Sequence, residues 1–154
     1  MFENLKLKRF ATLNTLFKGM EKPQIKQIIK SKNLKIFEEG TLIYKQNDDS
    51  TNLYLITDGE VKLKYCDGHK GEMKFLLDFF GEKEIIENTK RNSVAVAEKK
   101  CVLYEIPLKE LKSLIQQTPC IRKNLIAANN SRKENNQQNE LQRDIPQMSG
   151  KINF

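Results

Sequence analysis

The residues with the most specific chemistry in this chain are Gly81 and Glu82, followed after eight residues by Arg91. A glycine lets backbone N–H groups approach an anion closely. An arginine supplies a planar, permanently charged guanidinium that matches phosphate oxygens. A carboxylate accepts hydrogen bonds from sugar hydroxyls. These residue types together could hold a sugar linked to a phosphate, but Gly-Glu plus Arg also occurs by chance, so the surrounding elements decide its value.

The segment from residue 34 to residue 106 has the two-residue periodicity of short β-strands. Val61, Leu63 and Tyr65 alternate with lysines, which indicates a strand with one solvated face. The dipeptide Asp58-Gly59 predicts a tight hairpin turn. Short strands with a turn every 8–12 residues or so are typical of a sandwich, barrel or jelly roll. The other predicted strands are 42–44, 53–56, 93–97 and 101–106, with a mostly apolar run at 73–80.

Helices are predicted on both sides of this segment, which makes the fold class α+β, mainly β. In the N-terminal segment, residues 1–33, Ile25 and Ile29 share one helical face after Pro23. Pro107 ends the last strand, and residues 107–128 are expected to form two further helices. Residues 129–154 are polar, with almost no apolar side chains, so we expect a mobile or only locally helical tail.

The net charge of +7 is concentrated at the N-terminal end of the chain. Residues 1–35 carry nine Lys or Arg against two Glu, whereas the remainder carries 18 basic and 18 acidic residues. A nucleic acid or an anionic membrane could use such a surface. A solvated, lysine-rich helix face is the favoured interpretation, because only one of the nine is arginine and no aromatic residues are interleaved for stacking on bases.

Several function classes find no support in the composition. No run of 18 apolar residues exists, so no membrane-spanning helix is expected, and the N-terminus lacks the pattern of a secretory signal. Three scattered cysteines, Cys66, Cys101 and Cys120, indicate reduced thiols in a cytoplasmic protein rather than a metal site. The sequence shows no recognisable pairing of a nucleophile with a base of the kind that an enzyme would use. A catalytic role is therefore not expected.

The order of helix, β-roll and helix, with the Gly-Glu and Arg near the end of the roll, resembles the cyclic-nucleotide-binding domain family. Its relatives include catabolite-activator-type transcription regulators and the regulatory subunits of cyclic-nucleotide-dependent kinases. The resemblance covers roughly residues 13–127. It implies an eight-stranded antiparallel jelly roll. The resemblance lies in three stretches of sequence, which are residues 16–20, 37–48 and 53–61. In the second stretch, Asn47 stands where the family usually has glycine.

The resemblance also implies the ligand and the roles of the site residues. Glu82 would bind the ribose 2′-hydroxyl and Arg91 the cyclic phosphate, while backbone amides after Gly81 complete the phosphate site. Asn92 and Ser93 stand where the family contacts phosphate or base. The implied ligand is cAMP or cGMP, with no separate cofactor, and the choice between the two purines stays open.

Lys83 and Glu84 depart from the family pattern, which has Leu and a small residue at these positions. We expect Lys83 to point to water, although it could offset part of the charge of Glu84 if it turned inward. Two anions about 4 Å apart at an effective dielectric constant of about 20 repel by about 4 kcal/mol. That corresponds to nearly three decades of affinity for a phosphate beside Glu84. A sharper hypothesis is that Glu84 pairs with Arg91, fills the phosphate position and holds the domain closed without ligand.

These observations leave two classes of function open. The first is a regulatory module that binds a cyclic nucleotide in the roll and relays binding through the C-terminal helices. The second is a degenerate version of the fold that acts without ligand as a protein-interaction or homodimerisation module, using the helix at 121–128. DNA binding is not expected, because only some 26 polar residues follow Ala128 and no helix-turn-helix domain is recognisable.

Overall fold

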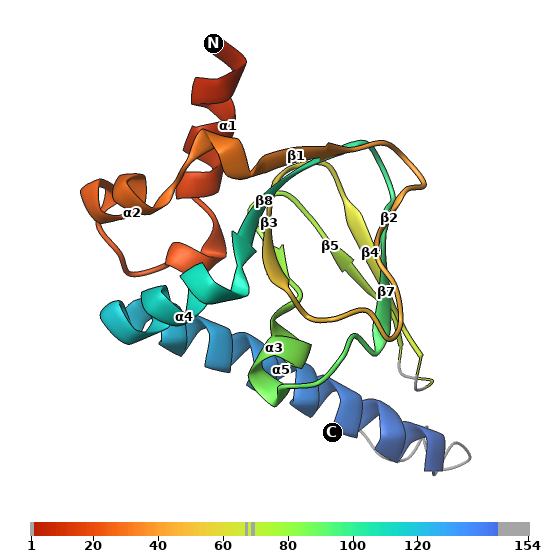
Figure 1. Ribbon diagram of the computed structural model, residues 1–154. Coiled ribbons are helices and arrows are strands. Elements are labelled where there is room, and N and C mark those ends of the chain that lie inside the picture. Colours follow the sequence, from red (N-terminus) through yellow and green to blue (C-terminus); the bar gives the residue numbers. More distant parts are fainter. Residues whose placement is uncertain (1, 67, 69, 145–154) are drawn as a thin grey trace.

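The computed structural model describes residues 2–66, 68 and 70–144. The chain begins with helical segments, continues through strands that are interrupted once by the short helix α3, and ends with two helices (Figure 1). The N-terminal segments are α1 (Phe2–Thr12), η1 (Thr15–Phe17), α2 (Lys22–Ile28) and η2 (Ser31–Asn33). The strands are β1 (Leu34–Phe37), β2 (Leu42–Tyr44), β3 (Asn52–Asp58), β4 (Val61–Tyr65), β5 (Glu72–Lys74), β6 (Phe79–Phe80), β7 (Ser93–Ala97) and β8 (Cys101–Pro107). The remaining helices are α3 (Glu82–Glu87), α4 (Leu108–Gln117) and α5 (Pro119–Asp144).

In the described residues, the strands form two four-stranded antiparallel sheets with the orders β1-β8-β3-β6 and β2-β7-β4-β5. The chain crosses repeatedly from one sheet to the other, as in a jelly roll. The fold class predicted from the sequence, an antiparallel β-roll flanked by helices, is therefore confirmed. Figure 1 shows the helices gathered along one side of the roll, with α3 next to α5.

Two apolar clusters hold this arrangement together. One lies inside the roll between the two sheets and includes Ile56, Leu63, Phe80 and Leu103, each at most 1% exposed. The other lies between the first sheet and the helices, where Leu16, Leu55, Leu111 and Ile121 are fully buried. Strand β3 contributes side chains to both clusters, since successive strand residues point to opposite faces of the sheet.

Turn residues agree with the backbone that they must adopt. Gly59, in the predicted hairpin turn, has φ +94°, and a Cβ there would overlap the Lys100 carbonyl and Cys101. Asn47 stands where the family usually has glycine and has φ +73°. This is the left-handed conformation that asparagine tolerates better than most residues.

The turn before β6 is formed without a glycine. Leu77 takes φ +77°, donates its N–H to the Ile56 carbonyl (3.2 Å) and accepts from the Thr15 N–H (2.8 Å). Asn14 also donates to the neighbouring Asp78 carbonyl (2.7 Å). These long-range hydrogen bonds hold an uncommon leucine conformation and tie the N-terminal segment to the chain just before the candidate site.

The C-terminal part differs from the expectation of a short helix at 121–128 followed by a mobile or only locally helical tail. Helix α5 runs without interruption from Pro119 to Asp144. Burial of Ile121 and Leu125 fixes its first turns. The polar residues that follow include many Gln, Glu, Lys and Arg, which favour helix, so the helix continues after its apolar face ends. The expected tail at 145–154 lies outside the described residues.

Among the residues that the structure describes, none of the helices has the length and apolar character needed to cross a bilayer.

Candidate functional site

Gly81 and the helix that follows it form the first part of the site. Strand β6 ends at Phe80, and Gly81 turns the chain into α3 with φ +91° and ψ +5°. A Cβ on Gly81 would lie 3.2 and 3.3 Å from the two terminal nitrogens of Arg91. The left-handed backbone therefore favours glycine, and a larger residue would also press on the guanidinium.

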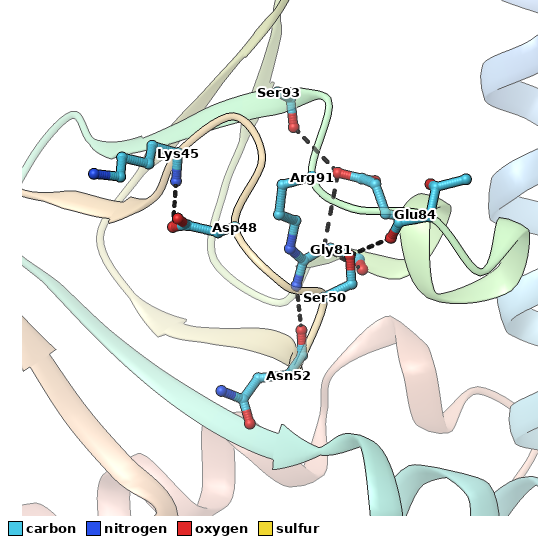
Figure 2. A network of polar contacts seen from close by, with 9 residues as sticks. Lys45, Asp48, Ser50, Asn52, Gly81, Glu84, Arg91 and Ser93 are labelled. Carbon is cyan, nitrogen blue, oxygen red and sulfur yellow. Dashed lines mark hydrogen bonds and ion pairs between the residues drawn. The ribbon is translucent and has the colours of Figure 1, made fainter.

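Arg91 is the centre of the site, and its side chain is almost fully buried (2% exposed). Its Nη1 donates to the Gly81 carbonyl (2.7 Å), and its Nη2 donates to the Asn52 carbonyl (2.6 Å), as Figure 2 shows. The β3–β6 pairing stops at Tyr54 because the chain turns into α3. Arg91 thus donates to the Asn52 carbonyl of β3 just beyond that pairing. It thereby links the start of β3 to the turn between β6 and α3.

The backbone of Arg91 is held from the other side by the loop after β2. Arg91 donates its N–H to the Asp48 carbonyl (2.9 Å) and accepts from the Asn47 N–H (2.8 Å). The Asp48 carboxylate in turn accepts from the Lys45 N–H (3.0 Å), which closes the loop on itself (Figure 2). The stretch with Asn47 in the left-handed conformation therefore positions the arginine.

Glu84 reaches the same guanidinium from α3. Its Oε1 lies 3.8 Å from Nη1 of Arg91 and 3.4 Å from Oγ of Ser93, with the Glu84 side chain 3% exposed (Figure 2). The pairing that we hypothesised between Glu84 and Arg91 is present. It is a long ion pair added to two shorter hydrogen bonds, so the backbone carbonyls are the principal partners of the guanidinium.

An aromatic ring covers Arg91 on the inner side of the roll. The guanidinium carbon lies 4.1 Å from the ring centroid of Tyr44, a distance at which a cation is attracted to the ring. Behind this ring, Tyr54 and Phe80 stack at 5.1 Å. Burial strongly raises the pKa of Tyr44, and the nearby Arg91 cation opposes that shift only in part.

Lys83 does not point to water, contrary to our expectation. It is 9% exposed, and its Nζ lies 5.2 Å from the ring centroid of Tyr65 on β4. The reason is that the first turn of α3 is packed into the fold, so three consecutive charged residues are buried. With Arg91 they form a balanced set of two acids, Glu82 and Glu84, and two bases, which lowers the cost of burying them.

The structure brings together Gly81, Glu84, Arg91 and Ser93. Glu82 is buried (1% exposed). Asn92 is half-buried and accepts the Cys66 N–H through its backbone carbonyl (3.0 Å). Its side-chain Oδ1 is buried and has no hydrogen-bond partner among the described residues.

Sequence reasoning missed Tyr44, Asn52 and the backbone role of Asp48. The sequence pattern identifies Tyr44 only as a strand residue, and Asn52 contributes only its carbonyl. No residue type or spacing identifies a backbone acceptor, so the sequence holds no signal for Asn52. The Gln46-Asn47-Asp48 stretch was recognised as part of the family pattern, but its contact with Arg91 depends on the tertiary fold.

Comparison with known proteins agrees with this fold. The family model for the cyclic nucleotide-binding domain matches residues 34–118, more than half of the chain. The chain therefore belongs to the cyclic nucleotide-binding domain family. The match runs from β1 through α4 and so contains both sheets and the whole candidate site.

Individual relatives are distant. The chain is 26% identical over 100 residues to the cAMP-dependent protein kinase type II regulatory subunit of Drosophila melanogaster, covering 65% of this chain and 26% of that subunit. The catabolite activator protein of Thermus thermophilus superposes with a TM-score of 0.70 at 22% identity, over 88% of this chain and 64% of that one. The regulatory domain of Toxoplasma gondii PKA, solved with cAMP, superposes with a TM-score of 0.60 at 19% identity, over 73% of this chain and 44% of that one. These likenesses in structure support the fold.

Proposed function

We propose that this chain is a non-catalytic regulatory module that binds cAMP or cGMP in its β-roll. The observation that carries the proposal is the buried Arg91 guanidinium, which lies against Gly81 at the start of α3 within a domain of the cyclic nucleotide-binding family. In this proposal Arg91 receives the cyclic phosphate, and Glu82 the ribose. Lys83, Asn92 and Ser93 lie on the segments that flank the ligand. The cytoplasmic location expected from the sequence stays a prediction.

Binding requires the Glu84 carboxylate to give way. Its Oε1 lies 3.8 Å from Nη1 of Arg91, on the guanidinium to which this proposal assigns the phosphate. A cavity of about 220 Å³ borders Glu84 on the side of Ser50 and Asn88, which gives the carboxylate a place to move when a phosphate displaces it. Glu84 then acts as an internal competitor, and affinity for the nucleotide is lower than it would be without this acid.

The C-terminal helices provide the route for relaying binding. Ile85 of α3 packs against the apolar cluster that contains Leu111 of α4 and Leu125 of α5. Asn124 on α5 also donates to the Leu16 carbonyl (2.7 Å), which couples α5 to the N-terminal segment. A displacement of α3 on ligand binding would therefore shift α4 and α5 against the roll.

Calorimetric titration of the full chain with cAMP and with cGMP tests the proposal, with 5′-AMP as a control that keeps base and sugar but lacks the cyclic phosphate. We expect saturable heat with a cyclic nucleotide, and a thermal midpoint that rises with its concentration. Absence of heat at millimolar cAMP and cGMP would remove the binding proposal. Equal binding of 5′-AMP would remove the role of the cyclic phosphate.

A second candidate is supported by the same Arg91 contacts. Because Asn52, Gly81 and Glu84 already contact both terminal nitrogens of the guanidinium, the fold is also compatible with a ligand-free module that binds a protein partner or a second copy of itself through α5. Its signature is a thermal midpoint that depends on protein concentration and not on nucleotide.

A further inference from the structure

A groove lies between the end of α1 and the outer side of α2, remote from Arg91. Its volume is about 600 Å³. Apolar side chains form part of its wall, with Leu13 almost half exposed (48%) and Ile29 buried beside it. A concave site with an exposed leucine can accept an apolar side chain of a partner.

Four cations also line this groove, two from each helix. They are Lys8 and Arg9 on α1 and Lys22 and Lys26 on α2. No acidic residue lines the groove, and within the part of the chain that the structure describes none of the four forms an ion pair. Their charges are therefore available to an external anion. The basic excess of the first 35 residues, which suggested only a solvated helix face, is in part collected around one apolar hollow.

The shape and composition of the groove favour one class of partner. A bilayer surface is flat and would meet a convex basic face rather than a hollow. Lysine and arginine also bind nucleic-acid phosphates, but among the residues that line this groove there is no aromatic side chain to stack on a base, and its apolar wall is leucine and isoleucine. A short amphipathic helix with acidic flanks matches both the apolar wall and the cations of the groove. Its apolar residues would fit the hollow, and its carboxylates would pair with the cations.

We propose that the groove lined by Leu13, Ile29 and the four cations Lys8, Arg9, Lys22 and Lys26 is a docking site for an acidic amphipathic helix of a partner protein. This inference is independent of nucleotide binding. Since α1 contacts β3 and the Thr15 N–H bonds the Leu77 carbonyl close to the candidate site, docking would attach the partner to the sensor domain itself.

The test uses the full chain without nucleotide and a fluorescein-labelled model peptide of about three to four helical turns. The peptide carries leucines at i, i+3, i+4 and i+7 and glutamates beside them. We expect saturable anisotropy. Binding should weaken at least tenfold for Lys22→Glu/Lys26→Glu and several-fold for Leu13→Gln. Raising the salt from 0.1 to 1 M shortens the Debye length from about 10 Å to about 3 Å and should weaken binding to the wild-type chain.

Lys64→Glu/Lys100→Glu is the matched control. It changes the net charge by the same amount at two exposed lysines of the β-roll, outside the groove. This variant should bind the peptide as the wild type does. Circular dichroism should show the same thermal midpoint for all charge variants, because every substituted lysine is exposed.

Two results would overturn the inference. One is absence of peptide binding, or binding that Lys22→Glu/Lys26→Glu leaves unchanged. The other is tighter binding of double-stranded DNA or of phosphatidylserine vesicles that depends on the same lysines, which would assign the surface to nucleic acid or to a membrane. Failure of nucleotide binding would leave this result untouched, so the two proposals fail separately.

Discussion

The Glu84 carboxylate lies 3.8 Å from the guanidinium of Arg91, and both side chains are sealed from solvent. Two neutral carbonyls, those of Asn52 and Gly81, make shorter contacts with the same guanidinium. The carbonyls therefore set the position of the arginine, and under the proposed function the acid is the group that the cyclic phosphate would displace.

The first prediction concerns this competition. Glu84→Gln keeps the size of the side chain and removes its charge, so the affinity for cAMP or cGMP should rise at least tenfold, or by about 1.4 kcal/mol. Coulomb repulsion at an effective dielectric constant of about 20 sets an upper limit of about 4 kcal/mol. Calorimetric titration measures the change. Glu87→Gln is the control, because Glu87 is exposed on the same helix, and an unchanged affinity for Glu84→Gln would reject the competition.

The second prediction concerns the stability that Arg91 provides. Arg91→Ala leaves a buried carboxylate and two carbonyls without their partner, so the free energy of unfolding should fall by about 3–5 kcal/mol. In a Glu84→Gln background the same substitution should cost about 1–2 kcal/mol less, since the buried charge is already gone. Urea unfolding of the four chains of this double-mutant cycle gives the coupling. Additive costs would show that the ion pair contributes nothing.

The third prediction separates backbone strain from contact at Gly81. Gly81→Ala and Gly40→Ala both place alanine at positive φ, at +91° and +83°, which costs about 1–2 kcal/mol. A Cβ at Gly40 meets open space, whereas a Cβ at Gly81 presses on the Arg91 guanidinium. Gly81→Ala should therefore lower the free energy of unfolding by about 1 kcal/mol more than Gly40→Ala. Equal losses in urea unfolding would mean that the arginine moves aside freely.

The fourth prediction concerns alkaline pH and Tyr44. Burial raises the pKa of Tyr44 above its ordinary value of 10.0, so the unfolded chain releases this proton at lower pH than the folded chain does. The stability that depends on the protonated Tyr44 hydroxyl is complete below about pH 10 and is lost as pH rises through the alkaline range. Tyr44→Phe retains the ring over Arg91 and removes the titrating hydroxyl. Its free energy of unfolding should fall less steeply above pH 10 than that of the wild type.

Tyr104 provides the comparison for this experiment. Burial raises its pKa as well, and its hydroxyl accepts from the Lys30 N–H (2.7 Å), a contact with no part in the site. Tyr104→Phe should therefore reduce the alkaline loss of stability without changing nucleotide affinity. If Tyr44→Phe left the slope of stability against pH identical to that of the wild type, the proposed burial of the Tyr44 hydroxyl would be wrong.

Much of the fold follows from local sequence signals. Strand alternation at Val61, Leu63 and Tyr65, and the turn at Gly59, depend on side chains and φ angles that neighbouring residues define. Leu77 shows the limit of such signals. A leucine gives no sequence signal for a left-handed turn, and the hydrogen bonds from Thr15 and to Ile56 that hold it come from distant parts of the chain.

The candidate site divides in the same way. Gly81 and Arg91 could be placed together from the sequence through the resemblance to the family, since the pair alone also occurs by chance. The same resemblance puts Glu84 beside the expected phosphate position, which suggested its pairing with Arg91. The orientation of Lys83 could not be predicted, since α3 buries its first turn only when it packs against the roll. The partners Asn52 and Tyr44 lie 39 and 47 positions from Arg91, and one of them acts through its backbone. Carbonyl positions and ring contacts between distant strands arise from packing of the whole domain, and therefore only the tertiary structure decides which groups surround the arginine.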